Sequence, residues 1–218
     1  MRLTLARGFT LWLPALALLT AGVARGQAIE FESNGLRYLT LTRDGLTIMF
    51  AELPVRVRDY AVMQVAVSNG SASNRTVKPE DFVLTPADGV AVRATPARTV
   101  VEGFLSRAGR NDVIKLVSMY EAGLYGLSRF QSTSGYEQRR QSALAELTSS
   151  RLKAAATASA VALVMTKLKP GETTDGAVFF PLATRPVAPG KLVAQVGVER
   201  FEFVLDELKH PGDLVRRP

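Results

Sequence analysis

The sequence predicts a mainly β protein, an antiparallel sandwich that carries an inserted pair of helices. Several segments at both ends of the chain alternate apolar and polar residues, as strands with one buried face do. Asp-Gly and Pro-Gly pairs separate these segments and supply the turns of an antiparallel sheet. Between the two β regions, one stretch changes to the 3.6-residue period of an amphipathic helix.

Residues 1–26 have the features of a secretory signal peptide. Arg2 and Arg7 precede an apolar stretch, and small residues then allow cleavage after Gly26 or Ala28. The alternative is a retained anchor, but the apolar stretch of about 15 residues is shorter than the roughly 20 of a spanning helix. We therefore expect export to the periplasm or cell envelope of a bacterium. The chain has no cysteine, so the exported domain must be stabilised by core burial and not by disulfides.

The first β region begins with a hairpin. Leu39 and Leu41 alternate with threonines, Asp44-Gly45 supplies a tight turn, and the alternation resumes from Leu46 to Phe50. The run Tyr60 to Val67 is almost continuously apolar, which is typical of a strand buried on both faces.

Shorter strands complete the predicted sandwich, which comprises residues 27–106 and 161–209, with 210–218 as a C-terminal tail. In the last strand, Phe201, Phe203 and Leu205 share one face, and we expect them in the core. The other expected strands are Phe82–Leu84, Val90–Ala94, Thr99–Phe104, Thr173–Phe180 and Leu192–Val196.

Residues 107–160 are expected to form the helical insertion. Val113, Leu116, Tyr120 and Leu124 lie on one stripe of a helix. A capping box at Ser134 starts a second, alanine-rich helix that continues at least to Ala158. Residues 161–165 fit either the end of this helix or the next strand.

Four aromatic residues fall around the connection between these helices. They are a candidate interaction surface, and the alternative is that they pack in the core: Tyr120, Tyr125, Phe130 and Tyr136.

No catalytic or metal-binding constellation is evident in the sequence. His210 is the only histidine, and without cysteine a zinc site would need mostly carboxylates. The acid pairs Glu30/Glu32, Glu80-Asp81 and Asp206-Glu207 are close in sequence, which does not show that they face each other across a cleft. We expect no catalytic residue, cofactor or metal.

The charge of the chain does not indicate a nucleic-acid partner. The formal charge of +7 includes three leader arginines, so the mature chain carries 24 Lys and Arg against 20 acids, or +4. These basic residues are scattered and form no stripe along one element.

The C-terminal part resembles a known class of domain. Residues 168–181 read LKPGETTDGAVFFP and residues 199–205 read ERFEFVL, which is similar to the ending of immunoglobulin-like domains in uncharacterised bacterial exported proteins. The resemblance implies an immunoglobulin-like antiparallel β-sandwich with an α-helical hairpin insertion. It supplies no catalytic residue.

The sequence thus favours an exported, non-enzymatic envelope protein that binds another protein or a cell-surface component through its sandwich or its helices. One alternative is a secreted hydrolase that uses carboxylates. Another is a peripheral membrane protein that uses the alanine-rich helix, with weak affinity because alanine buries little apolar area.

Overall fold

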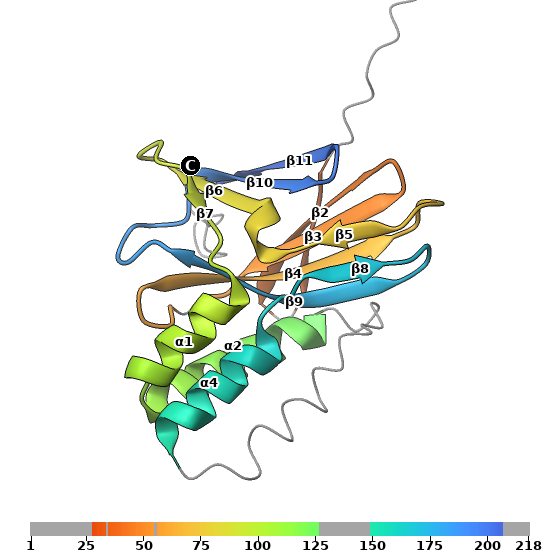
Figure 1. The fold of residues 1–218 in the computed structure, drawn as a ribbon. Coiled ribbons are helices and arrows are strands. Elements are labelled where there is room, and N and C mark those ends of the chain that lie inside the picture. The colour runs from red at the N-terminus through yellow and green to blue at the C-terminus, as the bar shows by residue number, and fades with distance from the viewer. Residues whose placement is uncertain (1–27, 34, 55, 127–148, 207–218) are drawn as a thin grey trace, which may run out of the picture.

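A computed structural model describes residues 28–33, 35–54, 56–126 and 149–206, and these form a mainly β structure with antiparallel sheets and three helices (Figure 1). This confirms the predicted class. The expected signal peptide, residues 1–26, and the tail, residues 210–218, lie outside the described residues.

The larger sheet has five antiparallel strands in the order β1-β2-β3-β4-β9. Asp44 and Gly45 have φ angles of 48° and 76°, as the tight turn of the predicted hairpin requires, so this prediction is confirmed. The bounds are β1 Ile29–Ser33, β2 Leu36–Arg43, β3 Leu46–Glu52, β4 Tyr60–Asn69 and β9 Thr173–Pro181.

A second antiparallel sheet has the order β11-β10-β6-β7, and β5 and β8 form a separate pair. These strands confirm most of the short strands expected from the sequence. The bounds are β5 Arg75–Val77, β6 Phe82–Pro86, β7 Val92–Arg93, β8 Thr166–Leu168, β10 Gly190–Val196 and β11 Glu199–Leu205, with a short 3-10 helix, η1, at Pro79–Asp81 before β6.

The described helices are α1 Ala97–Arg107, α2 Arg110–Gly126 and α4 Ser150–Val161. The strand expected at Thr99–Phe104 is wrong, because this segment lies within α1. Val100 and Phe104 are one helical turn apart and both are buried, so packing outweighs the strand preference of the β-branched residues that start the segment. The helix expected at 113–124 is confirmed by α2. The ambiguous segment 161–165 is resolved: α4 ends at Val161 and β8 begins at Thr166.

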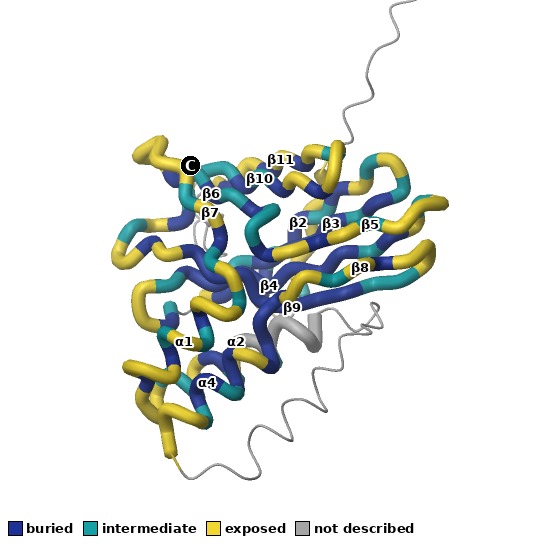
Figure 2. Tube along the Cα trace, viewed as in Figure 1, coloured by how far each residue is buried: buried dark blue, intermediate teal, exposed yellow. Residues whose placement is uncertain are grey.

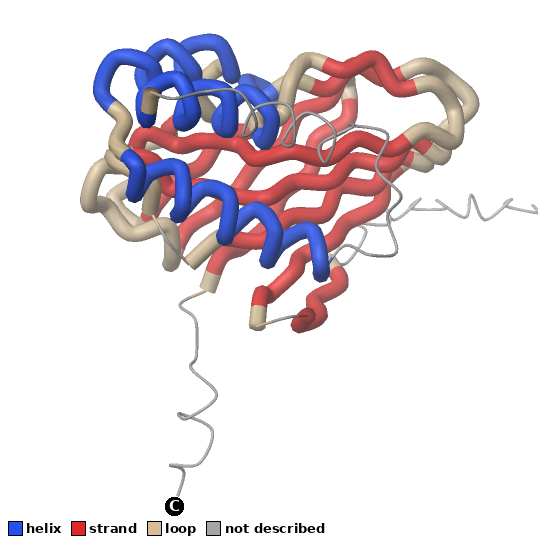
Figure 3. Tube along the Cα trace, turned by 90° about the horizontal axis from the view of Figure 1, so that it is seen from below, coloured by secondary structure: helices blue, strands red, loops and turns tan. Residues whose placement is uncertain are grey.

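The elements form three layers, with the five-stranded sheet in the middle (Figures 1 and 3). The second sheet lies on one face and the helices lie on the other. We call the two apolar clusters the inter-sheet core and the sheet–helix core. Strand β4 is buried on both faces between them, as its apolar run predicts (Figure 2).

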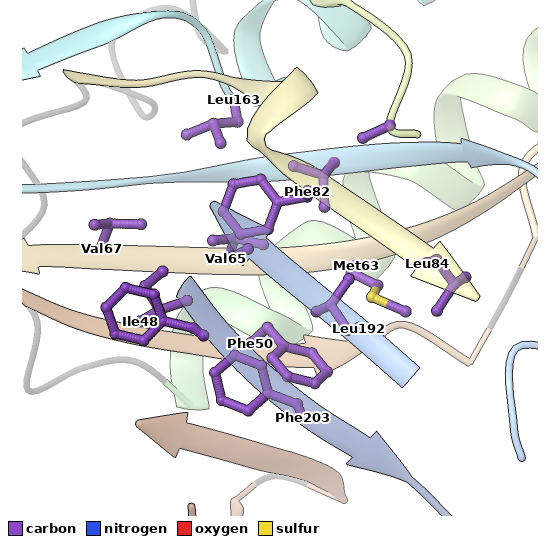
Figure 4. Close-up of a cluster of buried hydrophobic side chains, with 14 of the residues drawn as sticks. Ile48, Phe50, Met63, Val65, Val67, Phe82, Leu84, Leu163, Leu192 and Phe203 are labelled. Carbon is purple, nitrogen blue, oxygen red and sulfur yellow. The ribbon is translucent and has the colours of Figure 1, made fainter. Parts of the chain in front are cut away.

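The inter-sheet core is built from large side chains of both sheets (Figure 4). Phe50 of β3 meets Phe203 of β11 edge to face, with the ring centroids 4.8 Å apart. Phe201 and Phe203 are both buried, which confirms their predicted place in the core.

The sheet–helix core contains many small residues. Ala154, Ala155 and Ala158 of α4 are buried in this layer. None of the helices that the structure describes is both long and apolar enough to span a membrane.

Candidate functional site at the open end of the inter-sheet core

A pocket of about 320 Å³ opens at one end of the inter-sheet core, and we call it the end pocket. It lies where β2 begins and where β3 and β11 end. Its apolar lining comes from Leu36, Leu39, Phe50, Pro54, Ala188 and Leu205, and its charged lining comes from Arg37, Glu52 and Asp206.

The strand alternation explains why charged residues reach this pocket. Leu46, Ile48 and Phe50 of β3 point into the inter-sheet core, and Glu52 is the next residue on the same face. On β2, Arg37 similarly precedes Leu39 and Leu41. Each strand thus continues its core-facing row with a charged residue where the core reaches solvent.

Arg37 is held by a carboxylate from the neighbouring strand. Its Nε and Nη2 donate to the two carboxylate oxygens of Glu30 at 2.5 and 2.7 Å, which is a bidentate pair. These hydrogen bonds lower the pKa of Glu30 and raise the pKa of Arg37. The nearby charge of Asp206 also raises the pKa of Arg37. The positive charge of Arg37 is therefore already matched within the protein.

Glu52 is in a different situation. Its carboxylate makes no hydrogen bond with any described residue. Burial raises the pKa of Glu52, and the charge of Arg56 opposes this rise only in part. The Arg56 guanidinium donates its hydrogen bonds elsewhere, to the backbone oxygens of Ala183 at 2.9 Å and of Arg185. Glu52 is thus a half-buried acid with unused acceptor capacity.

The end pocket therefore combines an apolar wall with a carboxylate that can accept hydrogen bonds. Such a site suits a small apolar group that carries a hydrogen-bond donor. Glu52 and Asp206 line the same pocket, so the structure also brings two acids together.

The sequence reasoning did not identify Glu52. The acids singled out there were pairs close in the sequence, whereas Glu52 is a single acid that continues the alternating apolar row of Leu46, Ile48 and Phe50. Of the pairs it considered, Glu30 is bound to Arg37. Asp81 caps the turn into β6 by accepting a hydrogen bond from the Lys78 amide at 3.0 Å.

The predicted aromatic interaction surface is not among the described side chains. Tyr120 and Tyr125 belong to α2, but the structure does not describe their side chains. Phe130 and Tyr136 lie outside the described residues. The suggestion that these four residues form a binding surface therefore stays a prediction.

A second pocket, of about 130 Å³, lies beside α1. Arg58 lines it, but this side chain donates to the Arg107 carbonyl at 2.7 Å and lies 3.5 Å from the Asp112 carboxylate. These contacts join α1 to α2, so we assign Arg58 a structural role. Within the described ranges, no three His, Asp or Glu side chains cluster closely enough to hold a metal ion.

Comparison with known proteins gives little further information. No protein family and no curated protein matches the sequence. The crystal structure of the yjhA protein from Bacillus subtilis is similar over 76% of each chain, with 10% sequence identity and a TM-score of 0.31. A similarity at this level carries no argument about function.

Proposed function

We propose that this protein is an exported, non-enzymatic envelope protein that binds a cell-surface component in the end pocket. In this proposal its two larger sheets form an immunoglobulin-like sandwich, and the pocket is the open end of that sandwich. The component inserts a small apolar group between the sheets.

Export and fold are supported by independent observations. The leader-like residues 1–26 and the absence of cysteine favour an extracytoplasmic bacterial protein. The immunoglobulin-like arrangement is supported by two antiparallel sheets that share one core and by the resemblance of residues 168–205 to such domains.

The end pocket is the observation that carries the binding proposal. Its volume of about 320 Å³ is at the lower end of the range of roughly 300–1,000 Å³ seen for ligand pockets. A pocket of this size suits one ring or a short alkyl group better than a long chain.

A pocket-blocking variant tests this proposal. The mature protein would be titrated with three cyclohexane derivatives, which carry a hydroxymethyl, an aminomethyl or a carboxylate group, while amide NMR shifts are recorded. We expect at least one of them to shift the amide resonances of residues around Glu52 and Leu205. Ala188→Trp, which fills the pocket from its rim, should abolish these shifts.

The matched control places the same indole elsewhere. Val204 of β11 is 68% exposed and does not line the pocket, so Val204→Trp should leave binding intact. If no probe binds, or if both tryptophan variants bind as the parent does, the proposed site is wrong. Export is tested separately by N-terminal sequencing of protein from the periplasm, which should begin at Gln27 or Ile29.

A second candidate function is a carboxylate-dependent hydrolase, which is favoured by the presence of Glu52 and Asp206 in one pocket. Glycosidases use two facing carboxylates, one as an acid with a raised pKa, and burial raises the pKa of Glu52. This candidate predicts that nitrophenyl glycosides are hydrolysed and that Glu52→Gln and Asp206→Asn each abolish turnover. The binding proposal predicts no turnover in any of these proteins.

A further inference from the structure

We infer that the ligand of the end pocket is a small organic cation, an ammonium group on an apolar body, and that Glu52 pairs with the ammonium. The apolar body would lie against Phe50 and Leu205. This inference rests on the proposed function and specifies the chemical class of its ligand.

The charges around the pocket favour a cation. Three carboxylates, those of Glu30, Glu52 and Asp206, lie on or beside the lining, together with Arg37. Arg37 is engaged by Glu30 through two short hydrogen bonds, and Asp206 lies near the same guanidinium. The cation of Arg37 is thus shared between two acids, and Glu52 remains without an ionic partner that lines the pocket.

The position of Glu52 defines where the positive group would bind. This side chain ends the core-facing row of β3, so it projects from the apolar wall next to Phe50. Partial burial removes water from the carboxylate, and no described residue replaces that water with a hydrogen-bond donor. An ammonium supplies three donors and a positive charge, and hydrogen bonds of this kind are about twice as strong as neutral ones.

Anionic ligands fit this site poorly. An anion at Arg37 would compete with Glu30 for the guanidinium, and it would lie beside Glu52 and Asp206. Arg56 offers no alternative, because its guanidinium is bound to the backbone oxygens of Ala183 and Arg185. We therefore expect the pocket to discriminate against carboxylates.

The test uses three probes with the same body and different head groups: cyclohexylmethylamine, cyclohexylmethanol and cyclohexanecarboxylate. Dissociation constants would be measured at pH 7.5 with the full mature chain. We expect the amine to bind about 10- to 100-fold more tightly than the alcohol, the range that a hydrogen bond to a charged group provides. The carboxylate should bind most weakly.

Glu52→Gln identifies the group responsible. This variant should bind the amine about as weakly as the alcohol, while its affinity for the alcohol stays that of the parent. The unchanged alcohol affinity also shows that the variant is folded. Glu32→Gln is the matched control, because it removes the same charge from an exposed residue of β1 that does not line the pocket.

The pH dependence gives an independent readout. As pH falls through the raised pKa of Glu52, the carboxyl becomes neutral and the affinity for the amine should fall, while the affinity for the alcohol stays constant. The hydrogen bonds to Glu30 raise the pKa of Arg37, so Arg37 stays charged over this range, and the pKa of Glu30 is lowered by Arg37. Asp206 also faces the pocket, so Glu52→Gln should remove most of the dependence and Asp206→Asn much less.

The outcomes separate the two proposals. If none of the three probes binds, the proposed pocket function is wrong and the inference fails with it. If the alcohol binds as tightly as the amine, or if Glu52→Gln leaves the affinity for the amine unchanged, the pocket function stands and the cation inference is wrong. Tightest binding of the carboxylate would also overturn the inference and would assign recognition to Arg37.

Discussion

The two faces of the central sheet are packed in different ways. On the inter-sheet face, Phe, Leu, Val and Ile from two sheets interdigitate, and the Phe50–Phe203 ring pair lies among them. On the sheet–helix face, the alanines of α4 let the helix approach closely, and this layer contains Gln64, a fully buried glutamine. The difference shows that strand alternation alone organises one core, whereas the other also depends on how closely helices can approach. The substitutions below test this comparison.

The largest effect should come from the inter-sheet face. Phe203→Ala removes a buried ring and its edge-to-face partner contact with Phe50, so the free energy of unfolding should fall by about 3–5 kcal/mol. Urea denaturation followed by circular dichroism would measure this loss. The neighbouring Val204 is exposed, and Val204→Ala should change stability by less than about 0.5 kcal/mol. Similar losses in both variants would contradict the assignment of the core face.

A smaller loss is expected where the chain crosses from the helix layer to the other face. At Gly176 of β9, an added Cβ would lie 2.5 Å from the Cα and 2.6 Å from the N of Leu163. The Leu163 amide donates to the Ala177 carbonyl at 2.9 Å, so the backbone after α4 is fixed there. Gly176→Ala should therefore cost about 1–3 kcal/mol through overpacking.

Gly103 provides the control for this substitution. It lies within α1, and apart from the backbone of α1 itself no described part of the chain lies within 4 Å of an added Cβ. Gly103→Ala should raise the free energy of unfolding by about 0.5–1 kcal/mol, because alanine favours the helix. A loss at Gly103 as large as that at Gly176 would show that the helix layer is packed more tightly than the structure indicates.

On the sheet–helix face, one substitution of a buried residue should increase the stability of the protein. Gln64 is fully buried between Ala51 and Ala177 of the adjacent strands, and neither polar atom of its amide has a hydrogen-bond partner among the described residues. Gln64→Met keeps the volume and removes the unsatisfied groups, so it should stabilise the protein by about 1–2 kcal/mol. The change would be measured as an increase in the free energy of unfolding.

Asn69, the last residue of the same strand, is the matched control. Its amide nitrogen donates to the carbonyls of Ser73 and Leu168, and its oxygen accepts from Ser71. Asn69→Leu should therefore destabilise, because it removes these hydrogen bonds and leaves the buried Leu168 carbonyl without this donor. If Gln64→Met also destabilises, Gln64 has a polar partner that the described residues do not supply.

The sequence predicted the inter-sheet face better than the sheet–helix face. Alternation at Leu46–Phe50 and at Phe201–Leu205 determines which side chains enter the first core, and both assignments are confirmed. The segment Thr99–Phe104 was misassigned, since its β-branched residues favour a strand while the burial of Val100 and Phe104 together requires a helix. Such burial depends on contacts with β-strands far away in the chain, which local pattern does not contain.

The candidate site was missed for a related reason. Glu52 lies on the same strand face as the apolar residues of β3. Whether that face ends in solvent or in a pocket depends on Leu205 and Ala188, about 150 and 136 residues further along the chain. The expectation that apolar strand faces are buried in a core was sufficient to predict the fold class. Locating the pocket required the relative lengths of β3 and β11, which local sequence patterns do not determine.

The smallest expected effect concerns the charges that end the inter-sheet core. Because burial raises the pKa of Glu52 above its ordinary value of 4.5, the folded protein binds this proton more tightly than the unfolded chain does. As pH rises from about 4.5 through the raised pKa, the unfolded chain releases the proton first, so the contribution of Glu52 to stability is lost. The unfolding free energy of the parent minus that of Glu52→Gln should therefore fall as pH rises over this range and then become constant.

Glu30 should show the opposite dependence, because its hydrogen bonds to Arg37 lower its pKa. It contributes stability above the unfolded-state pKa, and that contribution is lost as pH falls through the lower folded-state pKa. Since Glu30 is exposed, the effect of Glu30→Gln should stay below about 1 kcal/mol. Urea denaturation of both variants between pH 3 and pH 8 would give two curves of opposite slope against the parent. Parallel curves would mean that Glu52 is as well solvated or as well paired as Glu30, and the description of Glu52 as a half-buried acid without a hydrogen-bond partner among the described residues would be wrong.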